Sequence, residues 1–272
     1  MSTERGGGRF QSLRRAALRP FAWLLLQALL MSLALISVAW NLIALLLYPV
    51  LSAATGRRIG RVGIALGYRL FWTLAGATGL LRMDARVLDA LADERGLVLV
   101  ANHPSLLDAL MLVARLPRSA CVMKASLMHN PLLGPGARLA RYIRNDSPRS
   151  MLRLAVADLR QGGQLVMFPE GTRTAASHTL HPFRPGFALI AKLAEAPIQT
   201  VFIDTRSPYL GKGWPLWRLP PLPICFSVRL GRRFEPAPEP SVLVREIERY
   251  FAADLMAQSG TPPLATSAGV PP

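Results

Sequence analysis

LVLVANHPSLLD, residues Leu97–Asp108, is the stretch that decides the fold, because an uninterrupted aliphatic run changes abruptly to polar residues. The run Leu97–Ala101 predicts a strand buried on both faces, as in a parallel sheet covered by helices on each side. Pro104 suits the first position of a helix, where its missing N–H costs nothing. We therefore expect a helix over Pro104–Leu116 and a strand-to-helix corner before it.

A histidine and an aspartate lie at this corner. His103 follows the strand directly, and Asp108 is expected one turn into the helix. Side chains at the strand ends of open α/β sheets converge on ligands. A carboxylate beside an imidazole fixes its tautomer and stabilises its protonated form, which suits a general base. Alone, the pair is more typical of a helix-capping histidine beside a structural aspartate.

A second informative stretch is Phe168-Pro169-Glu170-Gly171-Thr172-Arg173, which also follows a short apolar run, Gln164–Met167. With Asn102–Asp108 it forms an ordered pair of boxes, N-H-x-x-x-x-D and then F-P-E-G-T-R. The pair resembles the glycerolipid acyltransferase family, that is, the 1-acylglycerol-3-phosphate acyltransferases and related lysophospholipid acyltransferases. The resemblance covers roughly residues 85–205.

The resemblance implies acyl transfer from a thioester, carried by acyl-CoA or acyl carrier protein, to the free hydroxyl of a lysophospholipid. The acceptor would be 1-acylglycerol-3-phosphate, and the product phosphatidic acid. His103 would be the base and Asp108 its partner. No serine or cysteine nucleophile is required, and no G-x-S-x-G elbow occurs in the chain. No cofactor and no metal are implied.

The second box is expected to bind the acceptor through Glu170, Gly171, Thr172 and Arg173. A guanidinium can hold a phosphate by two parallel hydrogen bonds, so Arg173 is the candidate for the headgroup. Glu170 could accept a bond from a glycerol hydroxyl or hold Arg173 in place. The alternative for both is an ordinary surface ion pair.

Arg144 is a further candidate for acceptor binding. The family's middle block has an arginine where this chain has Asn145, with Arg144 one place earlier. A shift of one residue in a strand turns the side chain to the other face, so the acceptor headgroup stays open. The same chemistry on an amino-acid lipid or a specialised polyene lipid is one alternative. A non-catalytic membrane protein that binds anionic lipid is another.

The charge balance favours an anionic membrane as a partner. The 272 residues carry a formal charge of +16, and only three of the 32 cations are lysine. We exclude nucleic acid, because no finger spacing, basic zipper or aromatic RNA-binding signature occurs. Cys121 and Cys225 are expected to be buried thiols in a reducing setting. Trp214 and Trp217 suit either a membrane interface or loop packing.

An apolar segment precedes the two boxes. The stretch from Pro20 to Gly56 contains no charged residue, and it is longer than the roughly 20 residues that cross a bilayer as a helix. Arginines flank it on both sides, which favours a hairpin or re-entrant pair, with Asn41 and Pro49 as break points. Ile64–Leu81 contains Arg69 and predicts an interfacial helix or, equally, a buried one.

The remaining pattern predicts an α/β fold with a mixed, mainly parallel sheet flanked by helices, preceded by an apolar membrane helix or helical hairpin. We expect a basic segment at 1–19, a membrane anchor with an interfacial helix at 20–82, an acyltransferase domain at 83–257 and a disordered tail at 258–272. The membrane would be the bacterial inner membrane, with the catalytic domain on the cytoplasmic side. Further strands are expected at Met83–Val87, Ala120–Met123, Leu165–Phe168, Ile198–Ile203 and Ile224–Leu230, and helices at Pro131–Ala140, from Pro148, at Gly186–Leu193 and at Ser241–Met256.

Overall fold

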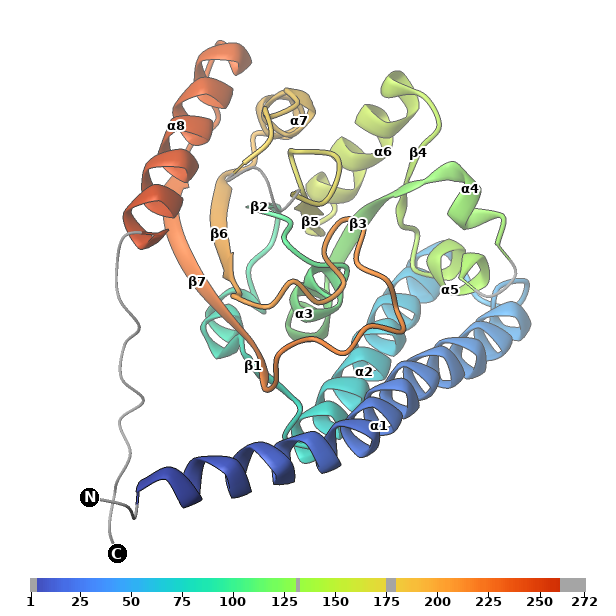
Figure 1. The fold of residues 1–272 in the computed structure, drawn as a ribbon. Helices are drawn as coiled ribbons and strands as arrows, with labels where there is room; N and C mark the ends of the chain where they lie inside the picture. The colour runs from blue at the N-terminus through green and yellow to red at the C-terminus, as the bar shows by residue number, and fades with distance from the viewer. Residues whose placement is uncertain (1–3, 131–132, 175–179, 260–272) are drawn as a thin grey trace, which may run out of the picture.

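The computed structural model describes residues 4–130, 133–174 and 180–259. Two long N-terminal helices, α1 (Glu4–Leu47) and α2 (Ala53–Ala77), lie side by side along an α/β domain (Figure 1). The domain is built on a single sheet whose strands alternate with helices along the chain. The predicted fold class is confirmed.

The sheet has seven strands in the order β1-β7-β6-β2-β5-β3-β4. All neighbours are parallel except β6 and β7, which are antiparallel. β2 lies at the centre, between β5 and β6, so the first box follows a strand with hydrogen-bonded neighbours on both sides. The strands are β1 (Leu81–Asp84), β2 (Leu97–Ala101), β3 (Ser119–Lys124), β4 (Ile143–Asn145), β5 (Gln164–Met167), β6 (Ile198–Asp204) and β7 (Ile224–Phe234).

Helices cover both faces of this sheet. Leu97, Leu99 and Ala101 of β2 pack into the cluster that includes residues of α1, α2 and α3 (Asp108–Arg115). Val98 and Val100 pack into the opposite cluster, with α6 (Pro148–Arg160), α7 (Gly186–Ala194) and α8 (Pro240–Ser259). Every residue of β2 is therefore buried, which explains why its sequence does not alternate.

The N-terminal apolar segment folds as a helical pair. The chain leaves α1 after Leu47 and re-enters a helix at Ala53, where the hydroxyl of Ser52 accepts a bond from Thr55 N. The break falls next to Pro49, because the residue before a proline is disfavoured in a helix. Asn41, the other expected break point, remains helical and bonds to Ser37 O. Leu18–Leu47 is long and apolar enough to cross a membrane, and only 17% of its most apolar window is buried.

The second apolar stretch lies mostly in α2, which packs against α1, α3 and α5 (Gly134–Leu139). Arg61 of α2 enters the domain and forms a buried ion pair with Asp158 of α6, 2.7 Å away. It also donates to the carbonyl oxygens of Ala140 and Arg118. Ala75 and Phe71 are buried on the same helix. The helical pair is therefore attached to the domain by packing and by a charged contact.

Several elements differ from expectation; for example, β4 was not among the expected strands, and β7 ends at Phe234 and not at Leu230. The first strand ends at Asp84, and a 3-10 helix (η1, Arg86–Leu91) follows, because Leu88 and Leu91 are both buried at its three-residue spacing. The short helix α4 (Ala125–Met128) was not expected. α3 begins at Asp108 and not at Pro104, so the prediction that Asp108 lies one turn into the helix is wrong.

Parts of two expectations lie outside the described residues. The helix expected at Pro131–Ala140 is described only from 133 onward, where α5 occupies Gly134–Leu139. The expected tail begins at 258, but α8 continues to Ser259, and 260–272 lie outside the described range. The basic segment 1–19 is described from Glu4, as the first part of α1.

Candidate active site

The two sequence boxes meet at one edge of the sheet. β2 and β5 are adjacent and parallel, with Val100 opposite Met167, so both boxes leave the sheet at its carboxyl edge. The backbone N–H of Thr174 donates to the carbonyl of His103 over 2.8 Å and joins the two loops directly. The strand order alone therefore brings together residues that are about 70 positions apart in the chain.

His103 and Asp108 form a hydrogen-bonded pair. Nδ1 of His103 lies 2.9 Å from Oδ2 of Asp108, and the imidazole stacks on the ring of Phe168 with centroids 4.0 Å apart. The same Oδ2 accepts a bond from Ser105 N over 2.7 Å. The carboxylate of Asp108 thus both closes the turn and orients the imidazole. With Nδ1 engaged, Nε2 is the ring nitrogen left to meet a substrate.

Burial governs the chemistry of Asp108. Its side chain is fully buried, while that of His103 is 17% exposed. Burial raises the pKa of the Asp108 carboxyl, and the bonds from His103 and Ser105 oppose this rise by stabilising the carboxylate. Among the described residues, Oδ1 has no hydrogen-bond partner. The interaction between the Asp108 carboxylate and His103 strengthens when the imidazole takes up a proton. A general base requires this arrangement.

Glu170 is buried and turned inward. Oε1 accepts from the backbone N–H of His103 over 3.2 Å, and Oε2 accepts from His181 N over 3.0 Å. The hydroxyl of Thr174 lies 2.9 Å from both oxygens. The carboxylate therefore holds the backbone of His103 to two positions in neighbouring loops, Thr174 and His181. Of the two roles expected for Glu170, holding Arg173 in place has no counterpart in these contacts.

Arg173 points toward the long loop between β6 and β7. Its Nη1 donates to the carbonyl oxygens of Leu210 and Gly211, over 2.8 and 3.0 Å. Among the described residues its guanidinium makes no further hydrogen bond, so the remaining N–H groups can meet an anion. Leu210 links Arg173 to the corner, because its carbonyl also accepts from Leu106 N over 3.0 Å.

The loop between Glu170 and Arg173 is open to solvent. Gly171 has a φ of +68°, and a Cβ there would lie 2.8 Å from Nε of Arg184. Only glycine fits this position without strain, because the backbone is left-handed and a guanidinium covers it. Thr172 is exposed. Arg184 itself is exposed, and its backbone N–H donates to Pro169 O, so it adds a second positive charge at this loop.

Arg144 is not brought to the histidine pair. It lies on β4, three strands away from β2, which is about 14 Å at the usual strand spacing. Its guanidinium is exposed and pairs with Asp146 over 2.8 Å. Asn145 is also exposed. The predicted role of Arg144 in acceptor binding stays a prediction, as do the roles of the other site residues.

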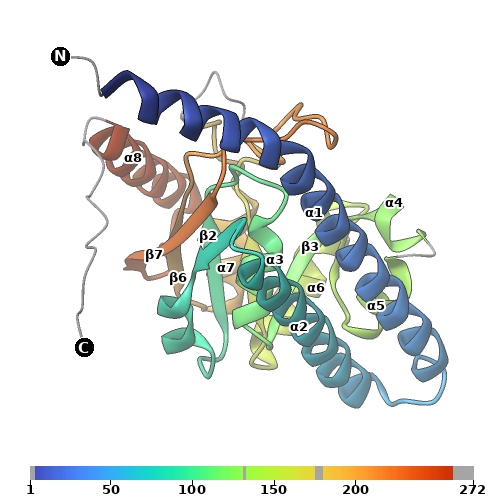
Figure 2. The same ribbon diagram turned by 60° about the horizontal axis from the view of Figure 1, so that its bottom comes forward.

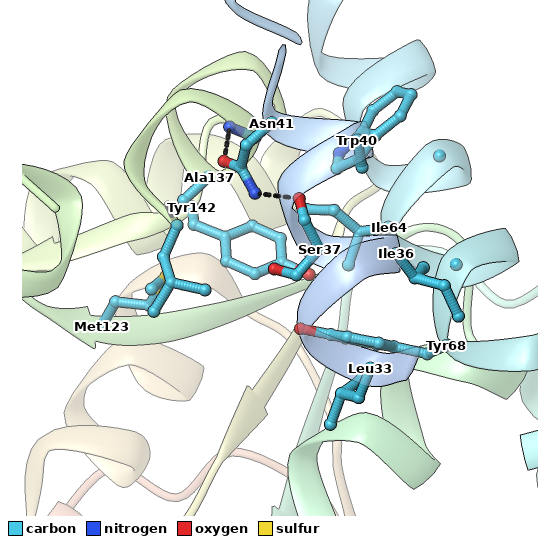
Figure 3. Close-up of a pocket in the computed structure, with 14 residues that line it drawn as sticks. Leu33, Ile36, Ser37, Trp40, Asn41, Ile64, Tyr68, Met123, Ala137 and Tyr142 are labelled. Atoms are coloured by element: carbon cyan, nitrogen blue, oxygen red, sulfur yellow. Dashed lines mark hydrogen bonds between the residues drawn. The ribbon is translucent and has the colours of Figure 1, made fainter. Parts of the chain in front are cut away.

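A separate hollow lies between the helical pair and the domain. It is lined by residues of α1, α2, α5 and β3, including Trp40, Asn41, Tyr68 and Tyr142, and it contains none of the predicted site residues (Figure 3). Its volume is about 60 Å³, which is room for a few water molecules. Trp40 Nε1 and the Tyr142 hydroxyl lack a partner among the described residues, so the hollow suits water better than a lipid chain.

The sequence analysis assigned no role to several residues that the structure places at the site. Asn102 is buried, and its amide bonds to both the N–H and the carbonyl of Ile203, which fixes the start of the corner against β6. Phe168 supplies the ring under His103, and Thr174 lies one position beyond the second box. Asn102 and Phe168 lie inside the two boxes, which is the signal that could have found them. Thr174 had no such signal.

No group of three or more histidine, cysteine or acidic side chains suited to a metal ion occurs within the described ranges. Cys121 is a partly exposed residue whose thiol is enclosed, and burial raises its pKa to about 12. Cys225 is exposed, so the expectation that both thiols are buried is wrong for it. It lies on β7, near the edge of the sheet, where alternate residues face solvent.

Comparison with known proteins gives a consistent set of relatives. A family model described as Acyltransferase matches residues 82–204. A 1-acyl-sn-glycerol-3-phosphate acyltransferase of Limnanthes alba is 28% identical over 69% of this chain and 66% of its own length. One from Helicobacter pylori is 33% identical over 39% of this chain and 47% of its own length. The chain spans less than two thirds of the length of these relatives.

A solved structure has the same fold. The 1-acyl-sn-glycerophosphate (LPA) acyltransferase from Thermotoga maritima superposes with a TM-score of 0.69 at 18% identity, over 90% of this chain and 99% of that one. The superposition extends beyond residues 82–204, so the match includes parts of the chain outside the family model.

Proposed function

We propose that this chain, which carries an acyltransferase domain over residues 82–204, is a member of the glycerolipid acyltransferase family that acylates 1-acylglycerol-3-phosphate at a membrane surface. The acyl donor is a thioester, acyl-CoA or acyl carrier protein, and the product is phosphatidic acid. The observation that carries this proposal is the His103–Asp108 pair at the carboxyl edge of β2, with Arg173 in the loop of the adjacent strand β5.

The imidazole acts as the base in this reaction. Nε2 of His103 takes the proton of the acceptor hydroxyl as its oxygen attacks the thioester carbonyl. The tetrahedral intermediate collapses, the C–S bond breaks, and the imidazolium returns the proton to the departing thiolate. Asp108 stabilises the imidazolium between these steps. The acyl group passes directly to the acceptor, so the enzyme needs no nucleophile of its own.

Arg173 binds the acceptor phosphate in this proposal. Two of its guanidinium contacts hold the backbone of Leu210 and Gly211, which fixes the plane of the group. The outer N–H groups then face an oxyanion in a fixed geometry. Arg184, beside Gly171, supplies additional positive potential at the same loop.

The N-terminal helical pair supports a membrane location. α1 exposes a long apolar surface, and the chain carries a strong excess of arginine. A lysophospholipid acceptor resides in a bilayer, so an enzyme seated there meets it without extracting it into water. Arginines also favour an anionic membrane surface.

The test is acyl transfer from a radiolabelled thioester to 1-acylglycerol-3-phosphate in vesicles. His103→Ala is expected to reduce kcat by about 10²–10⁴-fold, which is the contribution of general-base catalysis. His129→Ala is the matched control, because His129 is exposed and outside the site. Near-normal turnover of His103→Ala would exclude the mechanism.

A second candidate keeps the chemistry and changes the acceptor. Asn145 replaces the arginine that the resemblance leads us to expect, and Arg144 is paired with Asp146. A headgroup held by fewer cations, such as that of an amino-acid lipid, fits this arrangement. Assays with a panel of acceptors separate the two candidates: product from another lipid with none from 1-acylglycerol-3-phosphate favours the second. Vesicle binding without transfer to any acceptor would favour a non-catalytic lipid-binding protein.

A further inference from the structure

The loop between β6 and β7, residues 205–223, connects the catalytic corner to α1, and we call it the bridging loop. At one end, the hydroxyl of Ser105 donates to Tyr209 O over 3.1 Å, and Arg173 holds the carbonyls of Leu210 and Gly211. The loop is therefore part of the frame that positions the candidate phosphate-binding arginine.

Farther along, the tip of the same loop, Leu216 and Trp217, is bound to α1. Trp23 Nε1 donates to Trp217 O over 2.7 Å, and Gln27 Nε2 donates to Leu216 O over 3.1 Å. The loop crosses beside the N-terminal half of α1 (Figure 2). The backbone carbonyls at the tip thus face α1, whereas the two side chains are solvent-exposed: Leu216 is 53% exposed and Trp217 is 74% exposed.

The loop meets α1 beside an exposed apolar stripe on that helix. Phe21 and Leu24, next to Trp23 in sequence, are both more than half exposed. The stripe continues along the helix with Met31, Leu35, Leu42, Ile43, Leu45 and Leu46. Isolated exposed apolar residues are ordinary, but a contiguous surface of this extent indicates a partner. An indole at the edge of such a surface is typical of a bilayer interface.

The contacts of α1 fix how a bilayer can meet it. Trp23 bonds to the bridging loop, and Asn41 accepts from Gly136 N over 2.8 Å. These residues are 18 positions apart, about 27 Å along a helix, which is close to the full hydrocarbon thickness of about 30 Å. A spanning α1 would bring this polar domain into the lipid. The described contacts therefore favour a helix that lies along the surface with its apolar stripe in the membrane.

We propose that Leu216 and Trp217 insert into the bilayer interface beside α1, as a second membrane contact supplied by the catalytic domain itself. This rests on the proposed membrane function. The partner is a fluid bilayer that contains anionic lipid, because the exposed Lys212 and Arg218 flank the tip. Insertion of the tip sets the bridging loop, and with it Arg173, at the level of the lipid headgroups.

The first experiment measures tryptophan quenching by lipids brominated on their acyl chains, in phosphatidylcholine–phosphatidylglycerol vesicles that carry the full chain. The contribution of Trp217 is the emission lost in Trp217→Phe. Trp214→Phe is the control from the same loop, since Trp214 is partly buried and its Nε1 donates to Arg218 O. We expect the Trp217 contribution to be quenched at least about twofold more than that of Trp214.

Vesicle flotation separates the two proposals. If the intact chain does not float with vesicles, the membrane seat of the proposed function fails, and the inserted tip fails with it. If it floats but Trp217 is quenched no more than Trp214, only the inserted tip is wrong.

The second experiment compares two variants. In each, one exposed apolar residue is replaced by aspartate, and the two residues lie on opposite sides of the sheet. Trp217→Asp is expected to lower transfer to a vesicle-borne acceptor several-fold while leaving transfer to a soluble short-chain acceptor unchanged. Leu193→Asp on α7, which is 41% exposed on the opposite helical layer, should change neither rate. Equal effects of the two substitutions on vesicle-borne acceptor would overturn the proposal, and an unchanged melting temperature shows that each variant is folded.

Discussion

Replacement of Glu170 by glutamine tests whether this carboxylate holds neighbouring loops together or binds the substrate. The carboxylate accepts from His103 N, from His181 N and from the Thr174 hydroxyl. An amide has a single oxygen, so its NH₂ group must face one of the two backbone N–H donors. A buried donor that loses its acceptor costs about 1–3 kcal/mol, and at about 2 kcal/mol the melting temperature of a chain of this size falls by about 4–8 °C.

Loss of the bond to His103 N should also displace the strand end that carries the imidazole, and this displacement should lower kcat. A shift of a catalytic group by about 1 Å can cost about 100-fold, so we expect Glu170→Gln to lower kcat by about 10- to 100-fold and to leave KM for the acceptor within about twofold. Thr174→Val removes one donor and keeps the carboxylate, so its effects should be smaller. Glu235→Gln, at an exposed carboxylate, is the matched control.

The assay combines steady-state kinetics with a thermal melt of each variant. A large increase in KM with unchanged kcat and an unchanged melting temperature would refute the reasoning. That result would mean that Glu170 binds the acceptor directly and that its contacts to the two loops are incidental.

Three further outcomes are expected. Arg173→Lys should raise KM for the acceptor about tenfold, because one ammonium cannot hold the bridging loop and a phosphate in the planar geometry of a guanidinium; an unchanged KM argues against phosphate binding. Only Cys225 should react with a thiol reagent at pH 8, since the pKa of Cys121 is raised to about 12; titration with and without denaturant should therefore count one thiol and then two. Asp158→Ala leaves Arg61 buried without its counter-charge and should destabilise by about 3–5 kcal/mol, which a shift in the denaturation midpoint measures and which replacement of both residues by methionine should largely reverse.

The buried strand β2 and the strand end that carries His103 were predictable because each rests on a local signal. The unbroken aliphatic run of Leu97–Ala101 indicated a central strand, and the structure buries all five residues. Ser147 followed by Pro148 is also a local signature of a helix start, and Ser147 Oγ accepts from Ser150 N. Patterns of this kind depend on a few neighbouring residues, so they can be seen in one sequence.

The inward role of Glu170 could not be seen in this way. Its partners include His103, 67 residues earlier, and His181, 11 residues later, and no local pattern encodes their meeting. The same holds for Arg61 and Asp158, which are 97 residues apart. The start of α3 was misplaced for a related reason: Ser105 bonds to Asp108 and to Tyr209, so Pro104–Leu107 form a turn held by a distant loop.

The position of β1 has a consequence for how the molecule assembles. This strand leaves the helical pair directly, yet its neighbour in the sheet is β7, where Leu81 pairs with Ile224. The two segments are separated by more than half the chain, and such distant pairings close slowly. During synthesis, the edge of the sheet nearest the helical pair stays open until β7 has left the ribosome. A truncation before β7 would therefore leave the amino-terminal helices joined to a strand with no neighbour, a form suited to capture by chaperones or proteases.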